Sequence, residues 1–133
     1  MKIQYTVSFA TLAGVAIGAL AVQGLHAQAK PPVYYVAEIN VTNPDAYAKE
    51  YLPKVQAMIK EHGGRLLAAG GALSPTAKVT GFDGEAPKRV AIQVWDSLEK
   101  IQAWQNDPAY KELRKVGDKY ATFRSYAVDG VPQ

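Results

Sequence analysis

The sequence contains no cysteine and only two histidines among its 133 residues. Without cysteine there is no disulfide framework, so burial of apolar surface must stabilise the fold. One histidine, His26, precedes the expected cleavage sites described below, which leaves His62 as the single histidine of the exported chain. Metal sites need clustered histidine, cysteine or carboxylate ligands, and the acidic residues here are dispersed. We therefore expect neither a metal nor a bound cofactor.

Short motifs with a known mechanism are also missing. There is no G-x-S-x-G nucleophile turn, and Gly63-Gly64 and Gly70-Gly71 lack the lysine and hydroxyl residue of a phosphate loop. Neither sign of charge is in large excess, because removal of Lys2 with the leader leaves 14 basic and 12 acidic residues. This balance is too even to predict binding to nucleic acid or anionic lipid.

The first residues have the composition of a secretory signal peptide. Lys2 precedes an apolar run over residues 7–22, and small-residue cleavage options follow, after Ala27 or after Ala29. The alternative is an uncleaved membrane anchor, but the run contains two glycines and is shorter than the roughly 20 apolar residues of a spanning helix. We therefore expect residues 1–27 to be a leader and the protein to be periplasmic or secreted.

The remaining sequence alternates between strand and helix patterns. Period-two alternation predicts strands at residues 33–41, 65–69, 89–95 and 122–128. Apolar residues at three- and four-residue spacings predict helices at 43–62, from 96, and again from 108. The predicted fold class is α+β: a ferredoxin-like βαββαβ domain over residues 33–129 with a four-stranded antiparallel sheet. Its helices cover one sheet face, and the apolar opposite face predicts pairing with a second copy as a dimeric α/β barrel.

The sequence predicts the start, an internal break and the end of the first helix. Asn43 suits the N-cap position before Pro44, which suits the first helical turn. Pro53 removes a helical hydrogen bond, which predicts a kink or a break near Leu52. Gly63 can adopt the left-handed backbone conformation that ends a helix, so it predicts the end of this one.

The second half of the chain has weaker signals. Residues 70–88 predict a long loop with a small hairpin extension around Val79. Asp96 and Glu99, at capping-box spacing, predict the start of the next helix. An aromatic and basic cluster at helical spacings then predicts a stack of Arg114 on Tyr110 or Trp104.

Five stretches of the sequence carry a family resemblance. The stretches are YYVAEINVTNPDAY at 34–47, YLPKV at 51–55, HGGR at 62–65, Gly70-Gly71, and Trp104 followed by DPAY at 107–110. In their order and spacing they resemble the uncharacterised family called domain of unknown function 1330, from Val33 to the C-terminus. The resemblance implies a dimeric α/β barrel, similar to cofactor-free monooxygenases and to stress-responsive barrel proteins, and it implies no particular reaction.

A polar set on otherwise apolar strands forms the candidate ligand site. In a closed barrel these side chains would line a mostly apolar cavity with a few convergent polar groups. The set is Tyr34, Glu38, Arg65, Gln93, Trp95 and Tyr126.

Three residues are candidates for catalysis. Arg65 could hold a carboxylate or enolate oxygen, while His62 or Glu38 could transfer a proton. The structural alternatives are that Arg65 pairs with Glu38 or Asp45, and that His62 meets the negative end of its helix dipole.

These observations favour an exported homodimer that binds a small, partly apolar molecule in the barrel. One alternative is a non-catalytic structural or stress-related module whose open sheet face serves self-association. The other is a cofactor-independent enzyme of the monooxygenase or isomerase type.

Overall fold

The computed structural model describes residues 30–133, so the predicted leader and both cleavage sites lie outside the described residues. A four-stranded antiparallel sheet has the strand order β2–β3–β1–β4. Its strands are β1 (Val33–Val41), β2 (Arg65–Gly71), β3 (Arg89–Trp95) and β4 (Ala121–Asp129). This order confirms the predicted ferredoxin-like α+β fold, because β3 inserts between β1 and β2, the two strands joined by the first helical segment.

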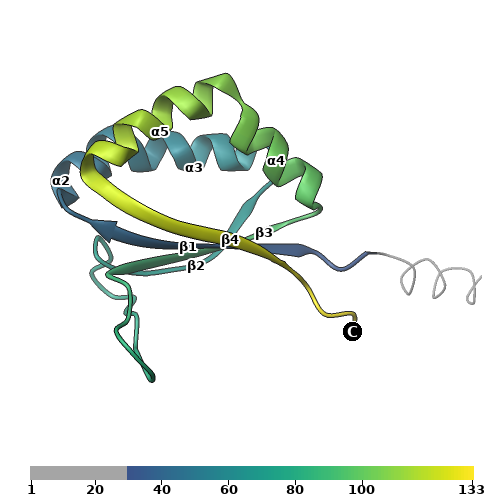
Figure 1. Cartoon of the computed structure of the whole chain (residues 1–133), viewed down its shortest axis with the longest axis horizontal. Helices are drawn as coiled ribbons and strands as arrows, with labels where there is room; N and C mark the ends of the chain where they lie inside the picture. The colour runs from purple at the N-terminus through teal and green to yellow at the C-terminus, as the bar shows by residue number, and fades with distance from the viewer. Residues whose placement is uncertain (1–29) are drawn as a thin grey trace, which may run out of the picture. The chain divides into compact units, whose positions relative to one another are not determined.

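The helices form a second layer on one face of the sheet (Figure 1). They are α2 (Pro44–Ala46), the π-helical turn η1 (Tyr47–Tyr51), α3 (Leu52–Glu61), α4 (Leu98–Asn106) and α5 (Pro108–Tyr120). None of the helices within residues 30–133 has the length and apolarity needed to cross a membrane.

Buried and less buried residues alternate along the two central strands, β1 and β3, and this alternation shows which sheet face forms the core. On β1 the odd-numbered residues from Val33 to Val41 are buried beneath the helices. Directly paired residues of antiparallel strands share a face, and Tyr35 pairs with Gln93 while Ala37 pairs with Ala91. The stripe of β3 that faces the helices is therefore the one containing Arg89 and Trp95.

The first helical segment is broken where Pro53 predicts a break. The backbone N–H of Leu52 donates to the carbonyl of Tyr47, five residues earlier, and α3 begins there with Pro53 in its first turn. Proline has no N–H to donate the next helical hydrogen bond, and the turn before it adopts the wider π-helical hydrogen-bonding pattern. At the front of the segment, Asn43 Oδ1 accepts from Ala46 N at 3.2 Å, so the predicted cap is confirmed.

A tight corner joins α3 to β2. Gly63 has φ +98°, which confirms the predicted left-handed cap. Gly64 N donates to the Ile59 carbonyl at 2.8 Å, and a Cβ on Gly64 would lie 2.5 Å from the Trp95 ring. The absence of a side chain at Gly64 thus lets the chain pass directly over the buried indole of Trp95.

Two local predictions are wrong. The cap of α4 is Ser97, whose hydroxyl accepts from Lys100 N at 3.3 Å, whereas Asp96 pairs with Lys100 Nζ at 2.9 Å. The preference of serine for an extended N-cap conformation decides this. No strand forms around Val79 within the described loop, which extends from the sheet away from the helices (Figure 1).

A bulge interrupts the alternation of β2. Regular alternation would put Arg65 and Leu67 on one face, but the bulge between Leu66 and Ala68 shifts the register. Arg65 and Ala68 therefore share the open face, while Leu66 points to the helix side with Gln93.

Candidate functional site

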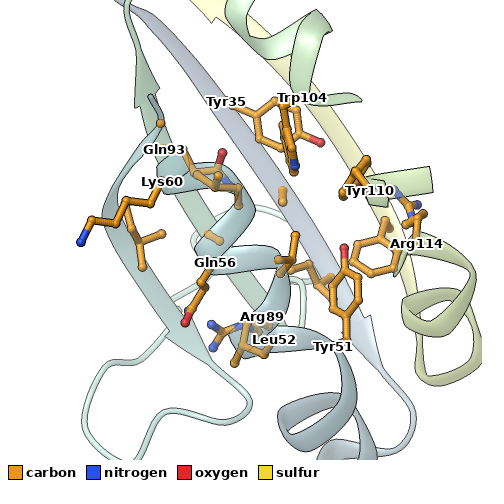
Figure 2. Close-up of a pocket in the computed structure, with 18 of the residues that line it drawn as sticks. Tyr35, Tyr51, Leu52, Gln56, Lys60, Arg89, Gln93, Trp104, Tyr110 and Arg114 are labelled. Carbon is orange, nitrogen blue, oxygen red and sulfur yellow. Dashed lines mark hydrogen bonds between the residues drawn. The ribbon is translucent and has the colours of Figure 1, made fainter. Parts of the chain in front are cut away.

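A cavity of about 390 Å³ lies between the helices and the sheet (Figure 2). Its size is within the usual range of small-molecule sites. Strands β1 and β3 form its floor, and η1, α3, α4 and α5 contribute to its walls. Aromatic residues dominate the lining: Tyr35, Tyr47, Tyr51, Trp104, Tyr110 and Phe123. This cavity lies on the opposite side of the sheet from the face where a barrel interior would form.

The aromatic wall is locked by ring packing around Trp104. Its indole stacks on Trp95 with centroids 5.4 Å apart and meets Tyr35 edge-on at 5.3 Å. Tyr110 contacts the same ring at 4.6 Å. Because Trp104 is only 2% exposed and has rings on several sides, its orientation is fixed.

Three tyrosines of the cavity, Tyr35, Tyr47 and Tyr51, are neutral at physiological pH. Burial raises the pKa of Tyr47 to about 12, although the positive charge of Arg89 opposes the rise. Burial also raises the pKa values of Tyr51 and Tyr35 above the ordinary tyrosine value. Their hydroxyl groups therefore act as hydrogen-bonding groups rather than as phenolates.

The charged residues that line the cavity, within the described part of the chain, include no carboxylate and are Lys60, Arg65, Arg89 and Arg114. Lys60 and Arg65 are exposed to solvent, whereas Arg89 is buried. A buried positive charge beside the cavity would favour an anionic ligand.

Arg114 and Arg89 differ in how their charges are compensated. Arg114 Nε donates to Asp118 Oδ1 at 2.8 Å, and its guanidinium lies 4.0 Å from the centre of the Phe123 ring. The predicted stack on Tyr110 or Trp104 is thus wrong, because β4 brings Phe123 beneath the guanidinium while the Tyr110 hydroxyl accepts a hydrogen bond at 3.4 Å.

Arg89 is buried without a carboxylate partner among the described residues. The residue is 5% exposed, and Nη1 donates to the Ala72 carbonyl at 3.0 Å. Its Nε has no hydrogen-bond partner, and none of the ion pairs within residues 30–133 includes it. Isolated buried charges are destabilising, so an anion in the cavity would stabilise this guanidinium.

The structure divides the six predicted ligand residues between the two sheet faces. Tyr34, Glu38 and Tyr126 lie on the open face, where Tyr126 OH donates to Glu38 Oε2 at 2.9 Å. This hydrogen bond raises the pKa of Tyr126. Gln93 and Trp95 lie on the helix side, because the pleat of β3 turns them away from the open face.

Arg65 stands at the edge of the cavity rather than in its interior. It is the first residue of β2, is exposed, and contributes to the cavity lining beside Lys60 and Gly64. It forms no ion pair with Glu38 or Asp45 within the described residues. Of the predicted set, therefore, Arg65 and Gln93 adjoin the observed cavity.

His62 joins the end of α3 to the start of α5. Its Nε2 lies 3.0 Å from Asp107 Oδ2, and it donates the shared proton to the ionised carboxylate. Asp107 Oδ1 also accepts from Ala109 N at 2.9 Å and so caps α5. Two hydrogen bonds lower the pKa of Asp107: the larger effect comes from His62 and the smaller from the Ala109 N–H.

This arrangement predicts that the stabilising effect of Asp107 depends on pH. A carboxyl whose folded pKa is depressed stabilises the protein above its unfolded pKa, about 3.9, and loses this effect as pH falls through the folded pKa. We expect Asp107→Ala to lower the urea midpoint at pH 5, with the difference from wild type shrinking below about pH 4. Urea denaturation between pH 5 and pH 2.5 measures it.

Ser97→Ala is the matched control for that series. It also removes an N-cap, but the Ser97 hydroxyl carries no charge, so its effect should not follow the same pH dependence. A constant difference between Asp107→Ala and wild type across the range would contradict the proposed role of the ionised carboxylate.

Arg89 was not predicted as a site residue for a specific reason. On β3 the stripe Val90, Ile92 and Val94 is the more apolar one, yet the stripe that begins with Arg89 faces the helices. A buried arginine within a strand was the available signal. Its interpretation needed the pairing of β3 with β1.

Other kinds of site are not formed by the described residues. Within residues 30–133, no three residues of the types His, Cys, Asp and Glu are grouped closely enough to hold a metal ion.

Several solved structures share this fold. The protein of unknown function RPA0582 from Rhodopseudomonas palustris is 18% identical, with a TM-score of 0.58 over 77% of this chain and 84% of that chain. SnoaB, a cofactor-independent oxygenase from Streptomyces nogalater, is 12% identical, with a TM-score of 0.57 over 77% of this chain and 96% of that one. At these identities the likeness shows the fold alone.

The fold and the cavity together define a ferredoxin-like α+β protein with an aromatic, basic pocket between its helices and its sheet. The chain belongs to the family described as Domain of unknown function (DUF1330), whose model matches residues 32–131. This match confirms the resemblance found in the sequence. Among curated proteins, none matches the sequence.

Proposed function

We propose that this protein binds a small anionic molecule with a flat, apolar body in the cavity between the helices and the sheet. The observation that carries the proposal is Arg89, a guanidinium that is 5% exposed and has no carboxylate partner among the described residues. An anionic group of a ligand would compensate this charge and complete its hydrogen bonding. The aromatic walls favour a flat ligand body, which can stack on or meet the edges of the rings.

Binding of 2-naphthoate by the wild-type protein tests this proposal. The control ligand is 2-naphthamide, which has nearly the same shape without the charge. At 100 times its dissociation constant, a ligand that binds only the folded state stabilises it by about 2.7 kcal/mol. We expect such a rise in denaturation midpoint with 2-naphthoate and little with 2-naphthamide at equal concentration. Equal rises for both ligands, or none for either, would contradict anion binding.

A second candidate function is cofactor-independent proton transfer, the step that begins oxygenation or isomerisation. The same cation that holds a carboxylate would stabilise the enolate that forms when a water molecule takes an α-proton from a bound ketone. SnoaB shares the fold and is a cofactor-independent oxygenase, which gives this candidate its support. Exchange of the α-hydrogens of 2-tetralone with deuterium oxide, followed by NMR, tests it. A rate equal to that of the buffer would exclude this reaction for that ketone.

We further propose that the protein acts outside the cytoplasm as a homodimer. The leader composition of residues 1–27 supports export. The open sheet face supports pairing, because Tyr126 and Val128 are 45% and 55% exposed beside the partly exposed Val36 and Ile92. The expected result is a protein in the periplasmic or secreted fraction that has lost residues 1–27 or 1–29 and has twice the chain mass by light scattering. A protein that keeps its full length would contradict export, and a strictly monomeric protein would contradict the homodimer.

A further inference from the structure

The indole N–H of Trp104 is a second unsatisfied group of the cavity wall. Its Nε1 is screened from solvent and has no hydrogen-bond partner among the described residues. Figure 2 shows this nitrogen on the side of the ring that faces the middle of the pocket. The stack on Trp95 and the contacts with Tyr35 and Tyr110 prevent the ring from turning toward another acceptor. A buried donor held without a partner is destabilising, which indicates an acceptor supplied by a ligand.

Gln93 adds a further donor at the same end of the cavity. Its side-chain oxygen accepts from Trp95 Nε1 at 2.9 Å, and the residue is 4% exposed. This hydrogen bond fixes which end of the amide is oxygen. The group that Gln93 leaves for the cavity is therefore its NH₂, another donor.

These two donors lie far from Arg89 along the sheet. Arg89 pairs with Ile39 and Gln93 pairs with Tyr35, so the two residues are four positions apart on β3. At the rise of a strand this separates their Cα atoms by roughly 13 Å. Figure 2 likewise shows Arg89 beside Leu52 at one end of the pocket and Gln93 and Trp104 toward the other. The cavity therefore has a cationic end and an end with neutral donors.

We infer that the ligand is an oxo acid: a flat, apolar molecule with an anionic group at one end and a carbonyl oxygen at the other. This inference rests on the proposed function, since it takes the anionic group to lie at Arg89. The carbonyl oxygen receives hydrogen bonds from Trp104 Nε1 and from the amide of Gln93. Neutral donors suit a neutral carbonyl, because a second anionic group there would lack a compensating charge.

A matched ligand pair tests the inference. The oxo acid is 6-acetyl-2-naphthoate, and its control is 6-isopropenyl-2-naphthoate, in which a CH₂ group replaces the carbonyl oxygen and the shape is kept. We expect the wild-type protein to bind the oxo acid about tenfold more tightly, the usual effect of a satisfied donor. Isothermal titration calorimetry of the wild-type protein with both acids gives the ratio, and it needs no variant that must fold.

Trp104→Phe assigns the preference to its donor. Phenylalanine keeps an aromatic ring in the stack but has no N–H, so the variant should lose most of the tenfold preference. Any change in packing affects both acids alike and cancels in the ratio. A preference that persists unchanged in Trp104→Phe overturns the role of its N–H.

The outcomes separate this inference from the proposed function. If the wild-type protein binds both acids equally well and more tightly than 2-naphthamide, the anion site stands and the oxo-acid inference is wrong. If it binds neither acid nor 2-naphthoate, the proposed function fails, and the inference fails with it.

Discussion

Replacing Arg89 by methionine should weaken the binding of 2-naphthoate by about 100-fold, the typical effect of removing one partner of a buried, hydrogen-bonded charge pair. The reason is the position of the guanidinium, which is buried beside the cavity and has no carboxylate partner among the described residues. Methionine has a similar length and no charge. Isothermal titration calorimetry of wild type and variant measures the change.

The same variant should leave the unliganded protein as stable as the wild type, or more stable by about 1 kcal/mol. Replacing a poorly compensated buried charge by an apolar side chain is often neutral or stabilising. Opposite effects on binding and on stability would distinguish a functional arginine from a structural one. Urea denaturation without ligand gives the second quantity.

Arg114→Met is the matched control. That guanidinium also lines the cavity, but it already pairs with Asp118 and lies over Phe123. Its replacement should destabilise the unliganded protein, because favourable contacts are lost, and should affect 2-naphthoate binding less than Arg89→Met does. A larger loss of binding in Arg114→Met than in Arg89→Met would move the anion site to the α5 side of the cavity. Marked destabilisation of the unliganded protein by Arg89→Met would contradict the assignment of Arg89 as a functional rather than a structural arginine.

Gly64→Ala should destabilise the protein by about 2 kcal/mol, the usual size of an overpacking effect. The added Cβ would lie 2.5 and 2.6 Å from Trp95 ring atoms and 2.7 Å from Ile59 Cγ2. Trp95 cannot retreat, since it is 1% exposed and stacks on Trp104. Movement of that stack should also disturb the cavity wall, so ligand affinity should fall with stability. Urea denaturation and 2-naphthoate titration measure the two effects.

Gly84→Ala separates steric overlap from backbone preference. Gly84 has φ +74°, and a Cβ there would have nothing within 4 Å. The cost of a left-handed conformation alone is roughly 1 kcal/mol, and ligand binding should not change. If Gly84→Ala destabilises the protein as much as Gly64→Ala does, close packing on Trp95 is not the reason for the glycine.

The local features of the fold were readable from the sequence because they depend on neighbouring residues. Asn43 before Pro44 fixed a helix start, Pro53 a break and Gly63 an end, and the structure confirms each of them. The order of elements then left few topologies, so the ferredoxin-like fold followed. The Ser97 cap was missed because the neighbouring Asp96 is an equally good cap residue by local criteria. The bulge in β2 was missed because regular alternation fits the same residues equally well.

The site was less predictable because it depends on which face of each strand is buried. A strand turns successive residues to opposite faces, and only the pairing of β3 with β1 decides that Arg89 and Gln93 face the helices while Glu38 and Tyr126 do not. Gln93 and Arg65 were identified as ligand residues from the sequence, and both adjoin the cavity. Arg89 was not identified, because its neighbours Val90 and Ile92 are the more apolar stripe.

The elements, their order and the family could therefore be predicted from the sequence, because caps, breaks and periodicity act over a few residues. Only the packed fold shows that an unpaired arginine and a fixed indole N–H lie at one aromatic cavity. These residues come from β3 and α4, and whether a polar atom finds a partner depends on every element packed around it. No local pattern carries that information.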